Sequence, residues 1–167
     1  MTGRDGVKLK DAWASGVEAF RGTTVPGFPD FFMLLGPNTG LGHTSVLFMI
    51  EAQVQHVLSC LRILFRAKAS TIEASAAATR RYNDALQRRL RRAVWSAGGC
   101  RSWYLDDAGV NRVIWPGFSF EYWARTRRAR RRDYELDGQR RLTPFAGRWR
   151  CGSRPPRRPG PVLRRWR

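Results

Sequence analysis

A glycine-rich turn at residues 36–42 is the stretch of this sequence best suited to chemistry. It follows Phe31–Leu35, an unbroken apolar run of strand length. The turn contains three glycines, which tolerate the positive φ angles of tight turns. Apolar residues then recur at three- and four-residue spacing, which predicts a helix near Thr44–Arg66. Thr44 or Ser45 is a candidate N-cap for that helix.

A strand, a glycine-rich turn and a helix in this order can bind an electron-rich group. Free N–H groups of the turn and the positive end of the helix dipole both point toward such a ligand. The turn residues that would surround it are Gly36, Pro37, Asn38 and Thr39. An ordinary βα unit with a tight turn has the same pattern, so the pattern alone leaves both interpretations open.

The segment from Gly40 to Ser45 departs from the dinucleotide-binding fingerprint. It reads G-x-G-x-x-S, with Ser45 in place of the third glycine, which allows close packing of helix and strand. The region about 20 residues further on, Leu61–Arg66, offers no acidic side chain for a ribose. A complete Rossmann dinucleotide site is therefore not expected at this turn.

Composition limits the class of protein. The 167 residues are 43% hydrophobic and 12% aromatic, as in globular domains. Three cysteines and two histidines show no spacing typical of a disulfide framework or a metal site. Met1–Lys10 lacks the apolar core of a signal peptide, and no apolar run approaches the ~18 residues of a membrane span. We therefore expect a cytoplasmic protein without a metal or a transmembrane segment.

The net charge of +18 is concentrated at one end of the chain. Residues 1–123 carry 15 Lys and Arg against 10 Asp and Glu, whereas residues 124–167 carry 16 against 3. Gly138–Arg167 contains no acid and is rich in Arg, Pro and Gly, so we expect it to be irregular. This tail is either a GC-rich stretch read in the wrong frame or a basic arm for RNA or anionic lipid.

Beyond the first helix the sequence predicts further elements. Thr71–Glu73 is a candidate short strand, and Ser75–Arg92 is predicted to form a helix with an apolar face and many arginines. Trp103–Trp115 is predicted to form a hairpin, and Phe118–Arg128 a short helix or an extended arm. We expect the aromatic side chains between Trp103 and Trp123 to pack mainly in the core.

Two long blocks of the sequence resemble one enzyme family. They are Thr24–Gln53, TVPGFPDFFMLLGPNTGLGHTSVLFMIEAQ, and Gly98–Trp123, GGCRSWYLDDAGVNRVIWPGFSFEYW. Both are similar to the C-terminal part of flavin-dependent monooxygenases of the Baeyer–Villiger and flavin-containing monooxygenase group, and they occur in that family's order. The resemblance covers roughly Asp5–Leu136.

The resemblance implies an α/β fold, an incomplete C-terminal portion of a Rossmann-like FAD-binding domain with two main helices, a short hairpin and a disordered basic tail. Residues 1–137 would form this portion, and residues 138–167 the tail. The implied cofactors are FAD and NADPH, and the implied reaction oxygenates a ketone, nitrogen or sulfur atom through a C4a-peroxyflavin. The residues implied near the flavin are Gly36, Pro37, Asn38, Thr39, Thr44 and Ser45, and Trp103 would lie near the nicotinamide of NADP.

The sequence also lacks parts that the family needs. Neither of the family's G-x-G-x-x-G motifs occurs here, nor does its peroxyflavin arginine, and no catalytic residue can be assigned. We therefore interpret the chain as a fragment, inactive alone, whose candidate partner is an upstream FAD- and NADP-binding polypeptide. The alternative is a small basic nucleic-acid-binding protein that uses Arg80–Arg92 and the tail, although no known nucleic-acid-binding motif appears.

Overall fold

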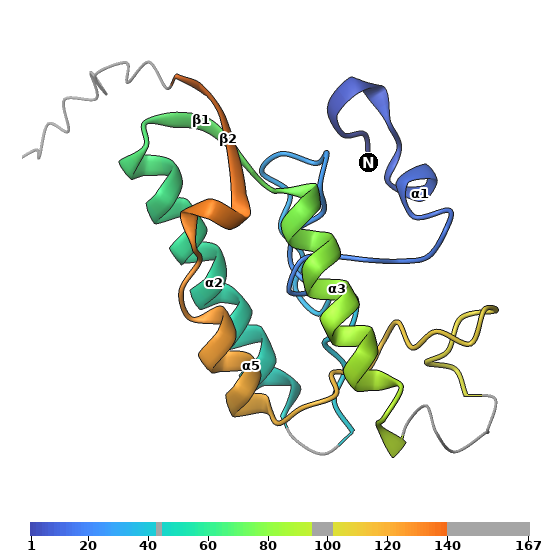
Figure 1. Cartoon of the computed structure of the whole chain (residues 1–167). Helices are drawn as coiled ribbons and strands as arrows, with labels where there is room; N and C mark the ends of the chain where they lie inside the picture. Colours follow the sequence, from blue (N-terminus) through green and yellow to red (C-terminus); the bar gives the residue numbers. More distant parts are fainter. Residues whose placement is uncertain (43–44, 95–101, 140–167) are drawn as a thin grey trace, which may run out of the picture.

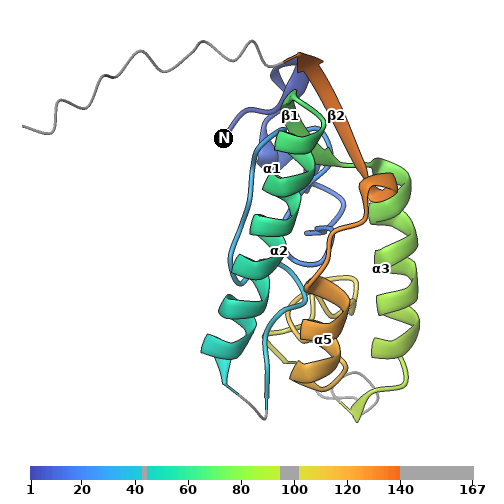
Figure 2. The ribbon, with the colours of Figure 1, turned by 90° about the vertical axis from the view of Figure 1, so that its left-hand side faces the viewer.

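The computed structural model describes residues 1–42, 45–94 and 102–139 (Figure 1). The long helix α2 lies beside the shorter α5 (Figures 1 and 2), and side chains of α3 pack with those of both helices in one core cluster. The only sheet in the described part of the chain has two strands, β1 and β2. The elements in chain order are η1 (Arg4–Gly6), α1 (Leu9–Ala12), α2 (Val46–Arg66), β1 (Ala69–Ala74), α3 (Ala76–Leu90), α5 (Ser119–Thr126), η2 (Arg131–Asp133) and β2 (Tyr134–Gln139).

Helix α2 confirms the prediction for Thr44–Arg66, and it ends where Lys68 adopts a φ of 51°. Its buried residues, spaced three and four apart, form one face. Its length and hydropathy also meet the requirements of a membrane span, which is weak evidence because core helices can meet them too. The buried face of α2 includes the polar side chains of Gln53 and His56, both hydrogen-bonded to other segments, as in a packed core helix.

Strand β1 confirms the short strand predicted near Thr71–Glu73 and pairs antiparallel with β2. The sequence did not predict β2, because Tyr134–Gln139 follows a run of arginines and lacks a clear alternation of apolar residues. Gly138 and Gln139, expected to be irregular, belong to this strand, so that expectation was wrong for these two residues. The rest of the tail, residues 140–167, lies outside the described residues.

The helix predicted at Ser75–Arg92 is observed as α3. Ser75 is its N-cap, and the Ser75 hydroxyl accepts a hydrogen bond from the N–H of Ala78 at 3.2 Å. Phe118–Arg128, predicted as a helix or an arm, contains the helix α5. The two main helices and the small sheet make this an α/β structure.

The strand predicted at Phe31–Leu35 does not form. Met33 N–H donates to the carbonyl of Thr23 at 2.7 Å, and Leu35 adopts a φ of 53°, which no strand contains. Among the described residues, no strand lies alongside this run to complete a ladder. The run instead packs Phe31 and Met33 against a small core around Val25 and Phe28, so its apolar character reflects side-chain burial without pairing.

The hairpin predicted at Trp103–Trp115 forms only at its turn. Asp106 N–H donates to the carbonyl of Val110 at 2.9 Å, and a single bridge joins Leu105 to Asn111. Regular strands are absent from this described segment because residues 111–115 make most of their backbone bonds on the other side, to residues 38–40.

The aromatic side chains of residues 103–123 divide between core and surface. Trp115 and Tyr122 are buried and meet edge to face with ring centroids 5.2 Å apart. Trp103, Phe118, Phe120 and Trp123 are exposed, with Trp103 81% exposed. The expectation of a mainly buried aromatic group was therefore wrong for these four side chains, because an aromatic-rich segment does not reveal which rings face a neighbouring element.

The N-terminal segment is mostly irregular and is attached to β1 through two carboxylates. Glu73 accepts from the Arg4 guanidinium at 2.6 Å and from the N–H of Gly27 at 2.6 Å. Asp30 accepts from the N–H of Ile72 at 3.0 Å and donates its own N–H to the carbonyl of Ile72. These bonds hold residues 1–30 against the sheet without any regular strand pairing.

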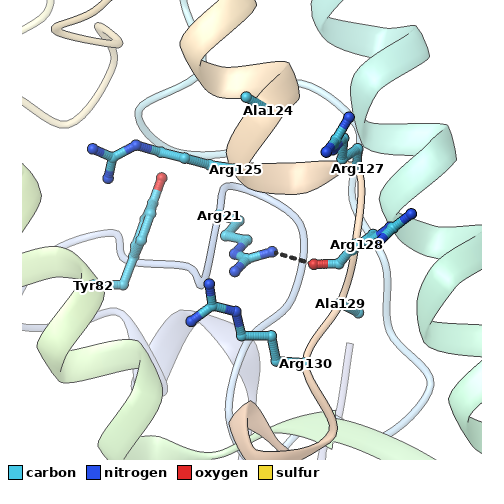
Figure 3. Close-up of a pocket in the computed structure, with 8 residues that line it drawn as sticks. All are labelled: Arg21, Tyr82, Ala124, Arg125, Arg127, Arg128, Ala129 and Arg130. Carbon is cyan, nitrogen blue, oxygen red and sulfur yellow. Dashed lines mark hydrogen bonds between the residues drawn. The ribbon is translucent and has the colours of Figure 1, made fainter.

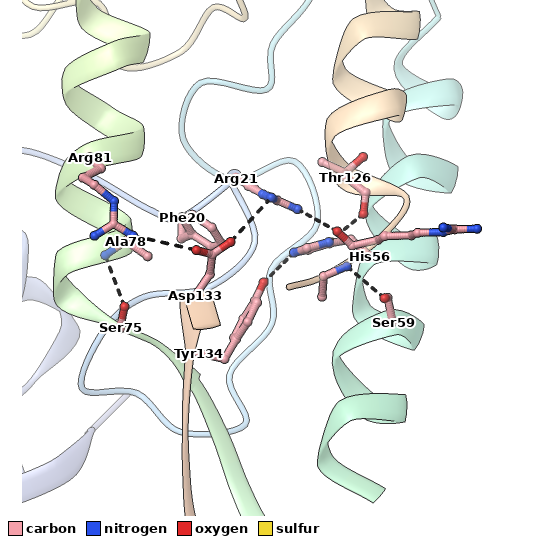
Figure 4. A network of polar contacts seen from close by, with 12 residues as sticks. Phe20, Arg21, His56, Ser59, Ser75, Ala78, Arg81, Thr126, Asp133 and Tyr134 are labelled. Carbon is pink, nitrogen blue, oxygen red and sulfur yellow. Dashed lines mark hydrogen bonds and ion pairs between the residues drawn. The ribbon is translucent and has the colours of Figure 1, made fainter. Parts of the chain in front are cut away.

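His56 joins α2 to α5 and β2 (Figure 4). Its Nδ1 lies 2.7 Å from the carbonyl oxygen of Thr126, and its Nε2 lies 2.6 Å from the hydroxyl of Tyr134. A carbonyl can only accept, so Nδ1 carries the proton and Nε2 accepts from the Tyr134 hydroxyl. Burial lowers the pKa of His56 to about 4, and the charge of Arg21 contributes in the same direction. The neutral imidazole is therefore the form that connects the three elements.

We predict that the free energy of unfolding decreases as the pH falls from about 6.5 to about 4. The unfolded His56 takes up a proton near 6.5 and the folded one only near 4, so acid favours the unfolded state. The two pKa values correspond to a loss on the order of 3 kcal/mol across this window. Urea titrations at a series of pH values measure it.

The control is His56→Gln, which should lower stability at every pH but remove this slope. The interval between about pH 6.5 and 5 is diagnostic, because paired carboxylates such as Glu121, whose pKa is lowered by Arg89, lose their contribution at lower pH. A slope in that interval that survives in the variant would contradict the role of His56.

Candidate functional site

Backbone hydrogen bonds join the glycine-rich turn to residues 111–115. Asn38 N–H donates to the carbonyl of Arg112 at 2.9 Å, and Gly40 N–H donates to that of Val113 at 2.8 Å. Trp115 N–H donates back to the carbonyl of Gly40 at 2.8 Å. Gly36–Gly42 lies outside any helix or strand, as predicted, and its shape is set by a segment more than 70 residues further along the chain.

Asn38 determines how the turn is held. It adopts a φ of 57°, a left-handed conformation that Asn tolerates better than most residues. Its side-chain Nδ2 donates to the carbonyls of Asn111 at 2.8 Å and Ile114 at 3.3 Å, and the residue is only 2% exposed. Both N–H donors of the amide are therefore used inside the protein. Asn38 shapes the turn, and its amide nitrogen does not project toward a ligand.

Gly36 and Thr39 close the turn on itself. The Thr39 hydroxyl donates to the carbonyl of Gly36 at 2.6 Å, and Thr39 is buried. A Cβ atom on Gly36 would lie 2.5 Å from the carbonyl oxygen of Gly22, so this position requires glycine. Within the described residues, the backbone N–H groups of Gly36 and Thr39 donate to no acceptor. Pro37 between them has no N–H to donate.

The N-terminus of α2 follows the turn. Ser45 occupies the N-cap position and is exposed, but its side chain makes no capping hydrogen bond. The first turn of α2 contains no acidic residue, so no carboxylate there compensates the positive end of the helix dipole. Thr44, the other predicted N-cap, lies outside the described residues.

The segment that contains Trp103 is attached to the same residues 111–115 through Arg112. The Trp103 ring is exposed and meets Tyr104 edge to face at 5.9 Å. The N–H of Arg112 donates to the carbonyl of Tyr104 at 3.1 Å, while the carbonyl of Arg112 accepts from Asn38. Arg112 therefore links the Trp103 segment to the glycine-rich turn, which brings together two groups of predicted site residues that are far apart in the sequence.

Two supporting residues were not singled out from the sequence. Gln53 is fully buried, accepts from the N–H of Leu35 at 2.9 Å and donates to the carbonyl of Gly22 at 3.2 Å. The Arg112 guanidinium donates to Asp106 at 2.9 Å and to Glu18 at 2.8 Å. Gln53 could have been noticed as a polar residue on the buried face of α2, but nothing in the sequence indicates the partners of Arg112.

The glycine-rich pattern alone left its function open, and comparison with known proteins narrows it. The chain is 49% identical over 135 residues to a Baeyer–Villiger monooxygenase of Pseudomonas aeruginosa, and 42% identical over 137 residues to one of Streptomyces coelicolor. These matches cover 80% and 81% of this chain. The chain resembles the C-terminal part of a flavin-dependent monooxygenase. It spans about a quarter of either relative, 26% of the length, and no protein-family profile matches it.

The fold of this monooxygenase-like chain also has solved counterparts. A steroid monooxygenase bound to NADP matches with a TM-score of 0.66 and 26% identity, over 82% of this chain and 26% of its own. The cyclohexanone monooxygenase of Rhodococcus sp. Phi1, bound to NADP+, matches with the same TM-score at 22% identity, over 82% of this chain and 26% of its own. These relatives confirm the family resemblance drawn from the two sequence blocks, and they give no support to the nucleic-acid-binding alternative.

We predict that Asn38→Ala destabilises the folded chain. Loss of the amide leaves the carbonyl of Ile114 without a donor and that of Asn111 with Gln87 alone, at a cost of roughly 1–3 kcal/mol. Alanine at a left-handed φ adds about 1–2 kcal/mol. Asn38→Gly is the matched control, since it loses the same hydrogen bonds but accepts the φ of 57°. Urea titration should rank the parent as most stable, then the Gly variant, then the Ala variant, and equal stability of all three would contradict this account of the turn.

Proposed function

We propose that this chain forms the flavin-bordering part of an FAD- and NADPH-dependent monooxygenase. The oxygen acceptor would be a ketone, in a Baeyer–Villiger oxidation, or a nitrogen or sulfur atom. The observation that carries the proposal is the 49% identity to a Baeyer–Villiger monooxygenase over 80% of the chain. Residues 1–137 would be a piece of a Rossmann-like FAD and substrate domain, followed by the basic tail from residue 138.

The glycine-rich turn fits the edge of a flavin ring. The unpartnered N–H group of Gly36 would donate to electron-rich ring atoms, with the buried Thr39 supporting the turn from inside, and the start of α2 at Thr44 and Ser45 would add the positive end of its dipole. Pro37 and Asn38 would keep this donor in place. When bound, FAD would supply the electron transfer and oxygen activation, while the protein positions the ring and excludes water.

Trp103 would lie on the nicotinamide and substrate side of the flavin. Its ring is 81% exposed in this chain, which suits a surface that another polypeptide or a ligand covers. An indole N–H can donate to a ribose or amide oxygen. The backbone of Arg112 is hydrogen-bonded both to the Trp103 segment and to the turn, so the distance between these two segments would stay the same when the cofactors bind.

An upstream FAD- and NADP-binding polypeptide would complete the enzyme and cover the exposed side of α2. Leu47, Val54, Leu58 and Phe65 are spaced seven and four residues apart and form one exposed apolar stripe, opposite the buried Gln53 and His56. Exposed stripes of this kind mark contact surfaces. The chain spans about a quarter of its relatives, so we expect the part that corresponds to the remaining three quarters to cover this stripe. The cytoplasmic location stays a prediction.

The isolated chain should bind FAD weakly or not at all, because the pyrophosphate-binding turn of this fold lies outside it. Co-expression with a relative's upstream portion should restore flavin. In that assembly Trp103→Ala should keep the flavin content and weaken NADPH-dependent reduction, whereas Phe120→Ala, which removes another exposed ring, should change neither. Flavin absorbance and stopped-flow reduction measure both. Stoichiometric flavin in the isolated chain, or loss of flavin in Trp103→Ala, would contradict the proposal.

The apolar stripe of α2 can be tested separately. Leu58→Glu places a charge on the stripe and should weaken association with the upstream portion by about tenfold or more, since a buried unpaired carboxylate costs over 1.4 kcal/mol. Gln55→Glu adds the same charge at an exposed position beside the stripe and serves as the control. Calorimetry gives the affinities, and circular dichroism checks the fold. Equal effects of the two substitutions would rule out the stripe as the interface.

A further inference from the structure

A pocket of about 700 Å³ opens beside Tyr82 of α3, the C-terminal half of α5 and the segment that follows it (Figure 3). Its wall is strongly basic. The polar lining consists of Arg21, Tyr82, Arg125, Arg127, Arg128 and Arg130. None of these residues belongs to the predicted flavin-bordering site.

The carboxylates near the pocket do not neutralise these arginines. Glu121 pairs with Arg125 at 2.8 Å but is shared with Arg89 at 2.6 Å. Asp133 lies 3.9 Å from Arg21 and 3.8 Å from Arg81, at the limit of an ion pair (Figure 4).

The remaining arginines leave the pocket with excess positive charge. Arg127 is placed over the ring of Trp123 at 5.2 Å, and in the described residues neither Arg128 nor Arg130 pairs with an acid. Figure 3 shows the guanidinium groups of Arg21 and Arg130 directed toward each other across the pocket. Like charges repel each other, and an anion bound between them would relieve this repulsion.

The hydroxyl of Tyr82 provides an independent sign of a missing ligand. Its oxygen is buried and has no hydrogen-bond partner in the described part of the chain. The ring is held edge to face against Phe20 at 5.5 Å, and the hydroxyl points toward the side chain of Arg125 (Figure 3). Burial raises the pKa of Tyr82, so the hydroxyl keeps its proton and remains a donor without an acceptor. Buried polar groups of this kind are rare and call for a partner.

We propose that this pocket binds a phosphate group, either inorganic phosphate or a phosphomonoester, through Arg21, Arg125, Arg130 and the Tyr82 hydroxyl. A phosphate offers several oxygens, which match the paired donors of guanidinium groups, and it accepts from a hydroxyl as well. Arg125 and Arg130 are both exposed, with 54% of the Arg125 side chain accessible, and movement of Arg125 would open the Tyr82 hydroxyl to the ligand. The site does not depend on the proposed monooxygenase function.

The test is calorimetric titration of the full chain with phosphate, against chloride at matched ionic strength. Tyr82→Phe removes only the unpartnered hydroxyl, so it should leave thermal stability unchanged or higher while weakening phosphate binding several-fold. Arg130→Gln should weaken binding by about tenfold, the loss of one charge-assisted hydrogen bond. Arg88→Gln removes the same charge from an exposed position of α3 outside the pocket and is the matched control.

Protection from phenylglyoxal, mapped by mass spectrometry, locates the bound ion among the many arginines. Phosphate should protect Arg125 and Arg130 and leave Arg88 reactive. The proposal is overturned if phosphate binds no better than chloride, if Arg88→Gln and Arg130→Gln lose the same affinity, or if Tyr82→Phe binds like the parent. It is also overturned if an added upstream portion protects these arginines without phosphate, since the pocket would then be a protein interface.

Discussion

The amide of Asn38 is the constraint on which the predicted site depends. One side chain donates to two carbonyls of residues 111–114 while its own backbone takes a left-handed φ. Those two requirements suit Asn, whose short polar side chain lets it adopt the left-handed conformation more readily than most residues. Because the turn and residues 111–115 hold each other, the N–H groups of Gly36 and Thr39 and the exposed ring of Trp103 keep one geometry without a regular sheet beneath them.

The two sides of helix α2 differ in their surroundings. One side is buried and contains Gln53 and His56, whose hydrogen bonds fix the surrounding irregular segments in place. The other side exposes an apolar stripe that the described residues do not cover. A chain with a quarter of its relatives' length is expected to have such a surface, because the packing partners of a core helix are distributed over the whole enzyme.

Arg21 connects the interior to the basic pocket. Its side chain is 12% exposed, donates to the carbonyl of Arg128 at 3.3 Å and lies near Asp133. Its charge helps to lower the pKa of His56 and lines the pocket beside Tyr82. A part-buried guanidinium with one distant carboxylate disfavours protonation of its neighbours and attracts anions, so Arg21 adds to the effect of burial on His56 and contributes positive charge to the pocket.

The sequence by itself determined the features that depend on local periodicity and on the residues of short continuous blocks. The spacing of apolar residues predicted α2 and α3, the glycines predicted an irregular turn at residues 36–42, and two long blocks revealed the resemblance to flavin monooxygenases. These features needed no knowledge of distant contacts, because helical periodicity and turn chemistry act over a few residues.

Only the tertiary structure decided which of the remaining segments pair and which side chains are used. Phe31–Leu35 is apolar enough for a strand, yet it packs without a ladder, while the polar Tyr134–Gln139 pairs with β1. Asn38 and Trp103 were both predicted site residues, but one amide is turned inward and one ring is exposed. Strand pairing and side-chain direction depend on contacts between residues that are far apart in the chain, and no local pattern contains them.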